Sequence, residues 1–261
     1  MSTPAPARPS FAAVRACAVT ARGAVRPGNE DAVLLFDWIN QSPRARLTEL
    51  TTAWTPPLVC AVADGLGGHS AGELASRLAV ADVANRYIAW DGPQAVHDGV
   101  IAVGHALHDT AARQPGTGGM RTTLAGVLLV DDGAYVFNVG DSRVYRLTDG
   151  YLEQLSVDDA GPDGATVTQS LGDPPEPPLA PHVALARLDP AGGRFLLCTD
   201  GVHGQLDERQ FRAICREPDA RALVERLRDE VYAAGAADNL TAVVVDVLPH
   251  PVDPPSGDPD R

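Results

Sequence analysis

The chain has 261 residues, 44% of them hydrophobic, and its 21 basic and 34 acidic side chains give a formal net charge of −13. This length allows one large domain or at most two small ones. The negative charge argues against binding to nucleic acid or to an anionic membrane surface, and no apolar run is long enough to span a bilayer. The four cysteines form no C-x-x-C pair, so we expect buried free thiols.

We expect one folded domain over residues 11–248, because no linker-like stretch divides this part of the chain. Residues 1–10 are rich in proline and alanine and predict a flexible leader, without the apolar core of a signal peptide. Residues 249–261 predict a disordered, acidic, proline-rich tail. Together these features favour a cytoplasmic protein.

The first half of the chain predicts three strands followed by two helices. Apolar runs predict strands at Val14–Thr20, Ala32–Phe36 and Leu58–Ala63, whereas the polar stretch Asn40–Pro57 is ambiguous. Apolar residues then recur at helical spacing, before and after Gly92-Pro93. They are Val80, Val83, Ala84, Tyr87 and Ile88 in the first helix, and Val96, Val100, Val103 and Leu107 in the second.

The second half returns to β-structure before two more helices. Apolar runs predict strands at Thr123–Val130, Ala134–Val139, Val144–Leu147, Tyr151–Leu155, His182–Leu188, Arg194–Thr199 and Thr241–Leu248. Asp-Gly pairs at 132–133 and 149–150 are typical of hairpins, and residues 156–181 predict a loop. Asp207 and Gln210 resemble a capping box, and a longer amphipathic helix follows over residues 220–231. This order predicts an α+β fold in which antiparallel sheets pack together with helices outside.

A glycine-rich turn follows the apolar run that ends at Ala63. Its sequence, Asp64-Gly65-Leu66-Gly67-Gly68, holds a carboxylate at a strand end where glycines allow close backbone approach. It is not a phosphate-binding Walker loop, because no Gly-Lys-Ser/Thr follows, and Ser70 breaks the dinucleotide pattern. By itself the turn fits a metal ligand or an ordinary solvated turn.

Carboxylates recur at the ends of five predicted strands. They are Glu30-Asp31, Asp64, Asp141, Asp200 and Asp238. Each alone is an ordinary turn residue, but clustered carboxylates repel one another unless cations bind between them. Oxygen ligands suit Mg²⁺ or Mn²⁺, and no Cys/His set has zinc spacing. Two such ions about 3.5–4 Å apart can activate a bridging water for attack on phosphorus.

These residues belong to a longer series of motifs that occur in order over residues 15–248. The series is Arg26-Pro27-Gly28-Asn29-Glu30-Asp31, Asp64-Gly65-Leu66-Gly67-Gly68-His69, Thr122-Thr123, Gly140-Asp141-Ser142-Arg143, Ser170-Leu171-Gly172, Cys198-Thr199-Asp200-Gly201 and Asp238-Asn239-Leu240-Thr241. In the sequence and order of these motifs, the chain resembles the bacterial metal-dependent Ser/Thr protein phosphatases of the protein phosphatase 2C family. The resemblance implies a four-layer αββα sandwich, in which two antiparallel sheets are flanked by helix pairs.

The resemblance also implies a site with two Mn²⁺ or Mg²⁺ ions. One ion would be held by Asp64, Asp200 and Asp238, and the other by Glu30, Asp64 and the Gly65 carbonyl. Asp31 would lie behind these ligands and orient them. Arg26 would grip the substrate phosphate in a bidentate manner, and Asp141 would contribute to a third, weaker metal site. Arg26 and Asp64 are the predicted catalytic residues.

Three departures from the family pattern affect this assignment. Leu66 stands where many eukaryotic members have a histidine proposed as general acid, and neither His69 nor His203 is predicted to replace it. Gly204 stands where an aspartate often helps to hold the third metal. The mobile flap of bacterial members is shortened here, between Asp158 and Gly172, which leaves a more open site.

The predicted function is hydrolysis of phosphoserine and phosphothreonine in proteins by a hydroxide that bridges two divalent metals. The implied partners are phosphorylated proteins, including a bacterial Ser/Thr kinase and its targets. Two alternatives stay open: a non-catalytic domain of the same fold that binds phosphoproteins, and a hydrolase of small phosphoesters. The intact set of carboxylates favours the enzyme over the binding domain.

Overall fold

A computed structural model describes residues 11–67, 70–131, 133–162, 166–174 and 176–251. The predicted leader, most of the predicted tail and His69 lie outside the described residues. Among the described residues, no helix is long and apolar enough to cross a membrane.

Two antiparallel sheets form the centre of the molecule, and their strands come from both halves of the chain. The first sheet has the order β10 (Tyr151–Gln154), β9 (Arg143–Thr148), β12 (Gly193–Cys198), β13 (Leu240–Leu248), β1 (Ala13–Ala21), β4 (Thr48–Ala53). The second has the order β11 (His182–Arg187), β8 (Gly133–Val139), β7 (Leu124–Val130), β5 (Leu58–Leu66), β2 (Asp31–Leu35), β3 (Trp38–Asn40), and β6 (Arg121–Thr122) pairs with β5.

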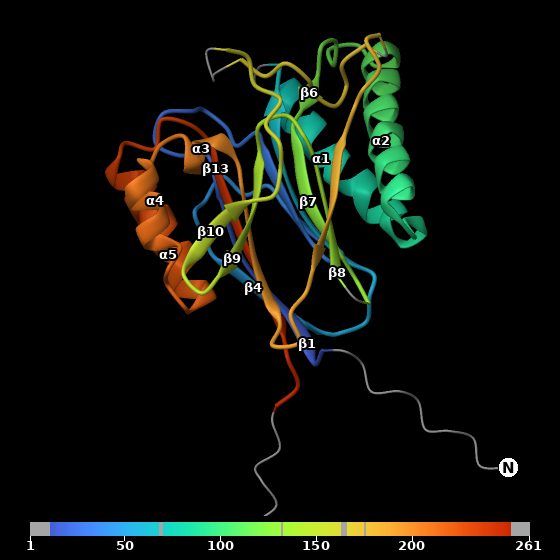
Figure 1. Ribbon diagram of the computed structural model, residues 1–261. Coiled ribbons are helices and arrows are strands. Elements are labelled where there is room, and N and C mark those ends of the chain that lie inside the picture. The colour runs from blue at the N-terminus through green and yellow to red at the C-terminus, as the bar shows by residue number, and fades with distance from the viewer. Residues whose placement is uncertain (1–10, 68–69, 132, 163–165, 175, 252–261) are drawn as a thin grey trace, which may run out of the picture.

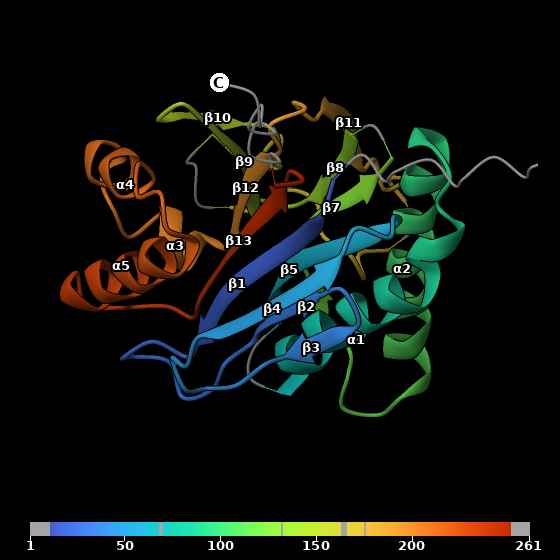
Figure 2. The same ribbon diagram turned by 90° about the horizontal axis from the view of Figure 1, so that it is seen from below.

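Helices cover the outer face of each sheet (Figures 1 and 2). The second sheet is covered by α1 (Ser70–Arg86), η1 (Tyr87–Ala89) and α2 (Pro93–Arg113). The first sheet is covered by α3 (Asp200–His203), α4 (Glu208–Ile214) and α5 (Ala220–Ala233). The predicted four-layer αββα sandwich is therefore confirmed.

Three apolar layers hold the four structural layers together. Between the sheets, inward residues such as Val14 of β1, Val62 of β5 and Phe195 of β12 are buried. Phe137 packs edge-on against Trp90 in the layer under α1 and α2, with ring centroids 5.7 Å apart. Because alternate residues of a strand face opposite sides, strands buried on both faces explain the continuous apolar runs of the sequence.

The structure adds elements that the sequence did not indicate clearly. The ambiguous stretch 40–57 contains β4, an edge strand whose residues alternate between half-buried and exposed. A short helix, α3, begins at Asp200, and β5 continues through Asp64 to Leu66. The predicted capping box is confirmed only in part: Asp207 Oδ1 accepts from the Gln210 backbone N–H at 2.8 Å, but the Gln210 side chain donates to Glu230 instead.

Candidate metal centre

The predicted site residues meet in one cavity at an end of the sandwich. The cavity has a volume of about 210 Å³, and both sheets contribute to its walls. Its lining includes Arg26, Glu30, Asp64, Gly65, Asp141, Asp200 and Asp238. These residues lie at or beside the ends of β2, β5, β8, β12 and β13, so the antiparallel pairing of the strands brings distant parts of the sequence together.

Asp31 lies behind the cavity and joins the two sheets. It is fully buried on β2, opposite Asp64 of β5. Its Oδ2 accepts hydrogen bonds from the hydroxyls of Thr199 at 2.8 Å and Thr241 at 2.7 Å, both from the other sheet. Burial raises the pKa of Asp31 to about 7, against the opposing effect of the two threonine hydroxyls.

Asp64 is fixed by its backbone, which leaves its carboxylate to face the cavity. The Asp64 N–H donates to Thr123 Oγ1 at 2.9 Å, and its carbonyl accepts from Thr122 Oγ1 at 2.8 Å. Burial raises the pKa of Asp64 well above its ordinary value, and the nearby charges of Asp31 and Asp200 raise it further. The cavity therefore concentrates negative charge that the protein alone does not neutralise.

Arg26 and Asp238 form an ion pair at the mouth of the cavity. Arg26 Nη2 lies 2.5 Å from Asp238 Oδ2, and about half of the arginine side chain is exposed. Asn239 holds this edge together: its Oδ1 accepts from the Glu30 N–H at 2.8 Å, and its Nδ2 donates to the Gly28 carbonyl at 2.8 Å. The arginine is thus presented to solvent on an anchored loop.

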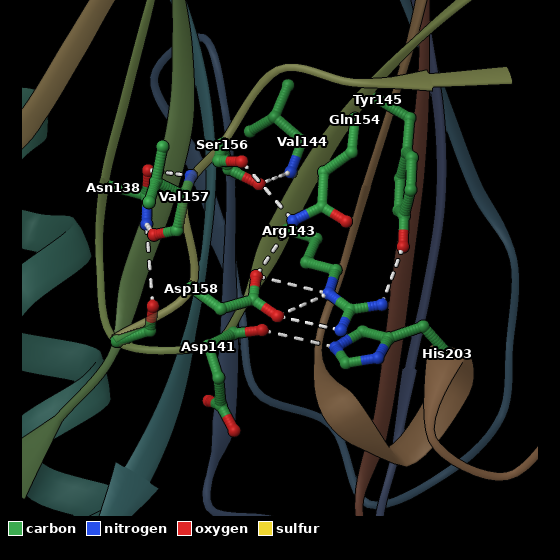
Figure 3. Close-up of polar contacts among 11 residues, drawn as sticks. Asn138, Asp141, Arg143, Val144, Tyr145, Gln154, Ser156, Val157, Asp158 and His203 are labelled. Carbon is green, nitrogen blue, oxygen red and sulfur yellow. Dashed lines mark hydrogen bonds and ion pairs between the residues drawn. The ribbon is translucent and has the colours of Figure 1, made fainter. Parts of the chain in front are cut away.

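Asp141 borders a second cavity of about 340 Å³, which also touches Asp200 and Gly204. Its backbone oxygen accepts from His203 Nε2 at 3.1 Å, and burial lowers the pKa of His203 to about 4, so the ring is neutral. Beside His203, Arg143 forms an ion pair with Asp158 and donates from both Nε and Nη2 to Asp158 Oδ2. The Asp141 carboxylate points away from that pair (Figure 3). Burial raises the pKa of Asp141 to about 6.

The donor set fits hard divalent cations. The described residues contain few buried side-chain oxygens without a hydrogen-bond partner, and they include Asp31 Oδ1 and Asp200 Oδ1, both at this site. Buried carboxylate oxygens without partners are costly unless a cation binds nearby. No three His, Cys, Asp or Glu side chains of the described ranges are grouped tightly enough to hold an ion as they stand.

Comparison with known proteins decides the family. The model of the protein phosphatase 2C family matches residues 50–243. The chain belongs to this family. The serine/threonine protein phosphatase PstP of Mycobacterium tuberculosis is 30% identical over 259 residues, which cover 90% of this chain and 45% of PstP. Protein phosphatase PhpP of Streptococcus pneumoniae is 28% identical over 216 residues, which cover 70% of this chain and 83% of PhpP.

Solved structures of bacterial phosphatases share the fold of this protein phosphatase 2C member. The catalytic domain of PstP in complex with two manganese ions matches with a TM-score of 0.73 and 29% identity, covering 90% of this chain and 99% of that one. The family predicted from the sequence motifs is therefore confirmed. The chain spans somewhat less than half the length of PstP itself.

Sequence reasoning assigned no role to four motif residues that position the carboxylates. Thr199 and Thr241 hold Asp31, Thr123 holds the backbone of Asp64, and Asn239 holds the loop before Glu30. Each belongs to one of the sequence motifs, so membership of a motif was the available signal. What the sequence lacked was the pairing across the two sheets.

Proposed function

We propose that this chain is a metal-dependent phosphatase that removes phosphate from phosphoserine and phosphothreonine in proteins. The observation that carries the proposal is the cavity in which carboxylates from both sheets converge with unpartnered buried oxygens. The names of the relatives support the phosphoprotein substrate, and the manganese in the PstP structure supports the metal requirement. We assign residues 11–248 to the catalytic domain.

Mn²⁺ or Mg²⁺ bound here would activate water at neutral pH and neutralise charge on the phosphoryl group. Glu30, Asp64 and the Gly65 carbonyl would hold one ion, and Asp64, Asp200 and Asp238 the other. Asp141 would hold a third ion weakly, because Gly204 supplies no carboxylate beside it. Asp31 keeps the two sheets, and with them the two halves of this ligand set, at a fixed spacing.

Arg26 is the residue of this chain that would bind the substrate phosphate. Its guanidinium lies at the cavity mouth, on a loop that Asn239 anchors, and it forms an ion pair with Asp238. A guanidinium offers paired N–H donors to two phosphate oxygens, which orients the phosphorus toward the cavity. If Asp238 held a cation instead of Arg26, the Arg26 guanidinium would be free to bind the substrate phosphate.

The setting proposed for this activity is the cytoplasm, with a Ser/Thr kinase acting on the same phosphoproteins. Two other functions of the same fold make different predictions. A binding domain without activity should retain phosphoproteins but release no phosphate. A hydrolase of small phosphoesters should turn over metabolites faster than phosphopeptides.

The test is release of inorganic phosphate from a phosphothreonine peptide, with and without added Mn²⁺. We expect release that requires Mn²⁺, and loss of at least about a hundredfold in Asp64→Asn, which removes one ligand charge while keeping the side-chain size. Asp229→Asn, an exposed carboxylate on α5 that pairs with Arg228, is the matched control. Release by Asp64→Asn at the rate of the unmodified protein would contradict the proposed site.

A further inference from the structure

A groove lies beside the metal cavity, along helix α2. It consists of two hollows of about 300 and 440 Å³, which share the side chains of Arg121 and Asp173. Val167 lines both the first hollow and the metal cavity, so the groove and the cavity lie side by side. β6 and the C-terminal end of α2 lie at the same end of the molecule (Figure 1). A peptide whose phosphorylated residue enters the cavity can therefore continue along this groove.

Arg121 stands at the junction between the cavity and the groove. It is on β6, directly opposite Leu66 of β5, and Leu66 lines the metal cavity. Residues opposite each other in an antiparallel pair point to the same face, with Cβ atoms about 4.5–5.5 Å apart. The next residue, Thr122, exchanges two backbone hydrogen bonds with Leu171, at 3.0 and 2.8 Å, which fixes the floor of the groove. Arg121 is thus held one side chain away from the metal cavity.

Within the described residues, Arg121 has one charged partner, Asp173, and most of the hydrogen-bonding capacity of the arginine is unused. Arg121 Nη1 lies 3.3 Å from Asp173 Oδ1, and the two side chains are 46% and 28% exposed. Asp173 is already held by Ser170, whose N–H and hydroxyl both donate to Oδ2 at 2.8 Å. A guanidinium has five N–H donors, so Arg121 has donors to spare. An exposed pair of this kind is weak enough for a substrate carboxylate to compete with it.

Arg121 is the candidate contact of this groove for an acidic side chain of the peptide. Among the described residues that line the two hollows, Arg121 is the only lysine or arginine, whereas Asp173 and Glu176 are acidic. The rest of the chain is strongly acidic, so an acidic peptide needs a cation at the point of contact. Asp173, the carboxylate beside Arg121, is committed to Ser170 and offers little to a basic peptide.

We propose that Arg121 is a specificity-determining residue that binds an acidic side chain of the substrate, close in sequence to the phosphorylated residue. The proposal rests on the proposed function, because it takes the metal cavity as the place of the phosphate. The substrate class is then phosphoserine or phosphothreonine flanked by glutamate or aspartate. The carboxylate would share or replace Asp173 on the guanidinium, while Arg26 and the cavity receive the phosphate.

The test compares phosphothreonine peptides that are identical except for glutamate or glutamine at each flanking position in turn. The unmodified protein, loaded with Mn²⁺ at low salt, should prefer glutamate at one or two positions by about threefold to tenfold in kcat/KM, mostly through KM. Arg121→Gln should lose this preference and still hydrolyse p-nitrophenyl phosphate at an unchanged rate, since that small substrate does not reach the groove. Arg212→Gln, which removes an exposed charge on α4 far from the groove, should keep the preference.

The outcomes separate this inference from the proposed function. Equal rates on all peptides, or the same glutamate preference in Arg121→Gln, would overturn the role of Arg121 while leaving the phosphatase intact. A preference for glutamine over glutamate would show that the groove repels acidic side chains and would also overturn the role of Arg121. If p-nitrophenyl phosphate is not hydrolysed either, the proposed function fails. In that case the role of Arg121 is tested by the binding affinity of the same labelled peptides. Equal affinity of the glutamate peptides for the unmodified protein and for Arg121→Gln refutes the inference.

Discussion

The metal-free protein should lose stability as pH rises, because Asp31 is buried without a full set of partners. Its pKa in the folded state is raised from 3.8 to about 7, mainly by burial. Between these values the folded state binds more protons than the unfolded state, so the free energy of unfolding falls as pH increases. The stabilising effect of the protonated form is complete at acid pH and is gone above about pH 7.

The size of the effect follows from the pKa shift. From pH 4.5 to pH 7 the slope is at most about 1.4 kcal/mol per pH unit, and partial titration at both ends of this range reduces the total loss to about 3 kcal/mol. Asp31→Asn removes the titrating charge and keeps the shape of the side chain. The difference in unfolding free energy between this variant and the unmodified protein should therefore shift by about 3 kcal/mol in favour of the variant between pH 4.5 and pH 8.

Urea denaturation of the metal-free proteins, followed by tryptophan fluorescence, measures this difference at each pH. Asp229→Asn, whose carboxylate is exposed on α5, should show a difference from the unmodified protein that does not change with pH. A difference between Asp31→Asn and the unmodified protein that is constant from pH 4.5 to pH 8 would refute the reasoning, because burial would then not control the titration of Asp31.

Three further substitutions test the site, the core and a helix end. A methyl group at Gly72 would overlap Glu30 Oε2, so Gly72→Ala should lower Mn²⁺ affinity, measured by calorimetry, about tenfold or more. Circular dichroism should show that α1 stays intact. Unchanged affinity would remove Glu30 from the ligand set. Phe137→Ala should cost about 3–5 kcal/mol in urea unfolding, since the ring is fully buried against Trp90, and a cost below about 1 kcal/mol would contradict the packing. Asp219 is the N-cap of α5, and its Oδ1 accepts a hydrogen bond from the Ala222 N–H at 2.8 Å. Asp219→Ala should therefore lower the free energy of unfolding by about 1 kcal/mol. No loss of stability would mean that water replaces the cap.

Much of the fold could be predicted from sequence because most strands are buried on both faces. Such strands give apolar runs that need no periodicity to be recognised, as at Leu58–Ala63. The same burial made the carboxylates informative, because Asp64 lies near the end of a buried strand, Asp200 just after one and Asp238 just before one. The convergence of Asp64, Asp200 and Asp238 on one cavity follows from that position.

Other features depend on contacts that one-dimensional patterns do not contain. β4 is an edge strand with one face half-exposed, so its threonines and glutamate carry no apolar signal. The threonine hydroxyls at Asp31 come from Thr199, just after β12, and Thr241 in β13, which lie 168 and 210 residues away in the chain. The ion pair of Arg26 with Asp238 likewise joins distant loops, and only the packing of the two sheets determines it.

Titration of the protein with Mn²⁺ by isothermal calorimetry tests the central claim most directly. We predict binding of two Mn²⁺ ions per chain in the unmodified protein, and loss of at least one of them in Asp64→Asn, whose fold is verified by circular dichroism. Absence of Mn²⁺ binding to the folded, unmodified protein would contradict the account, because the cluster of carboxylates would then serve some purpose other than holding metal.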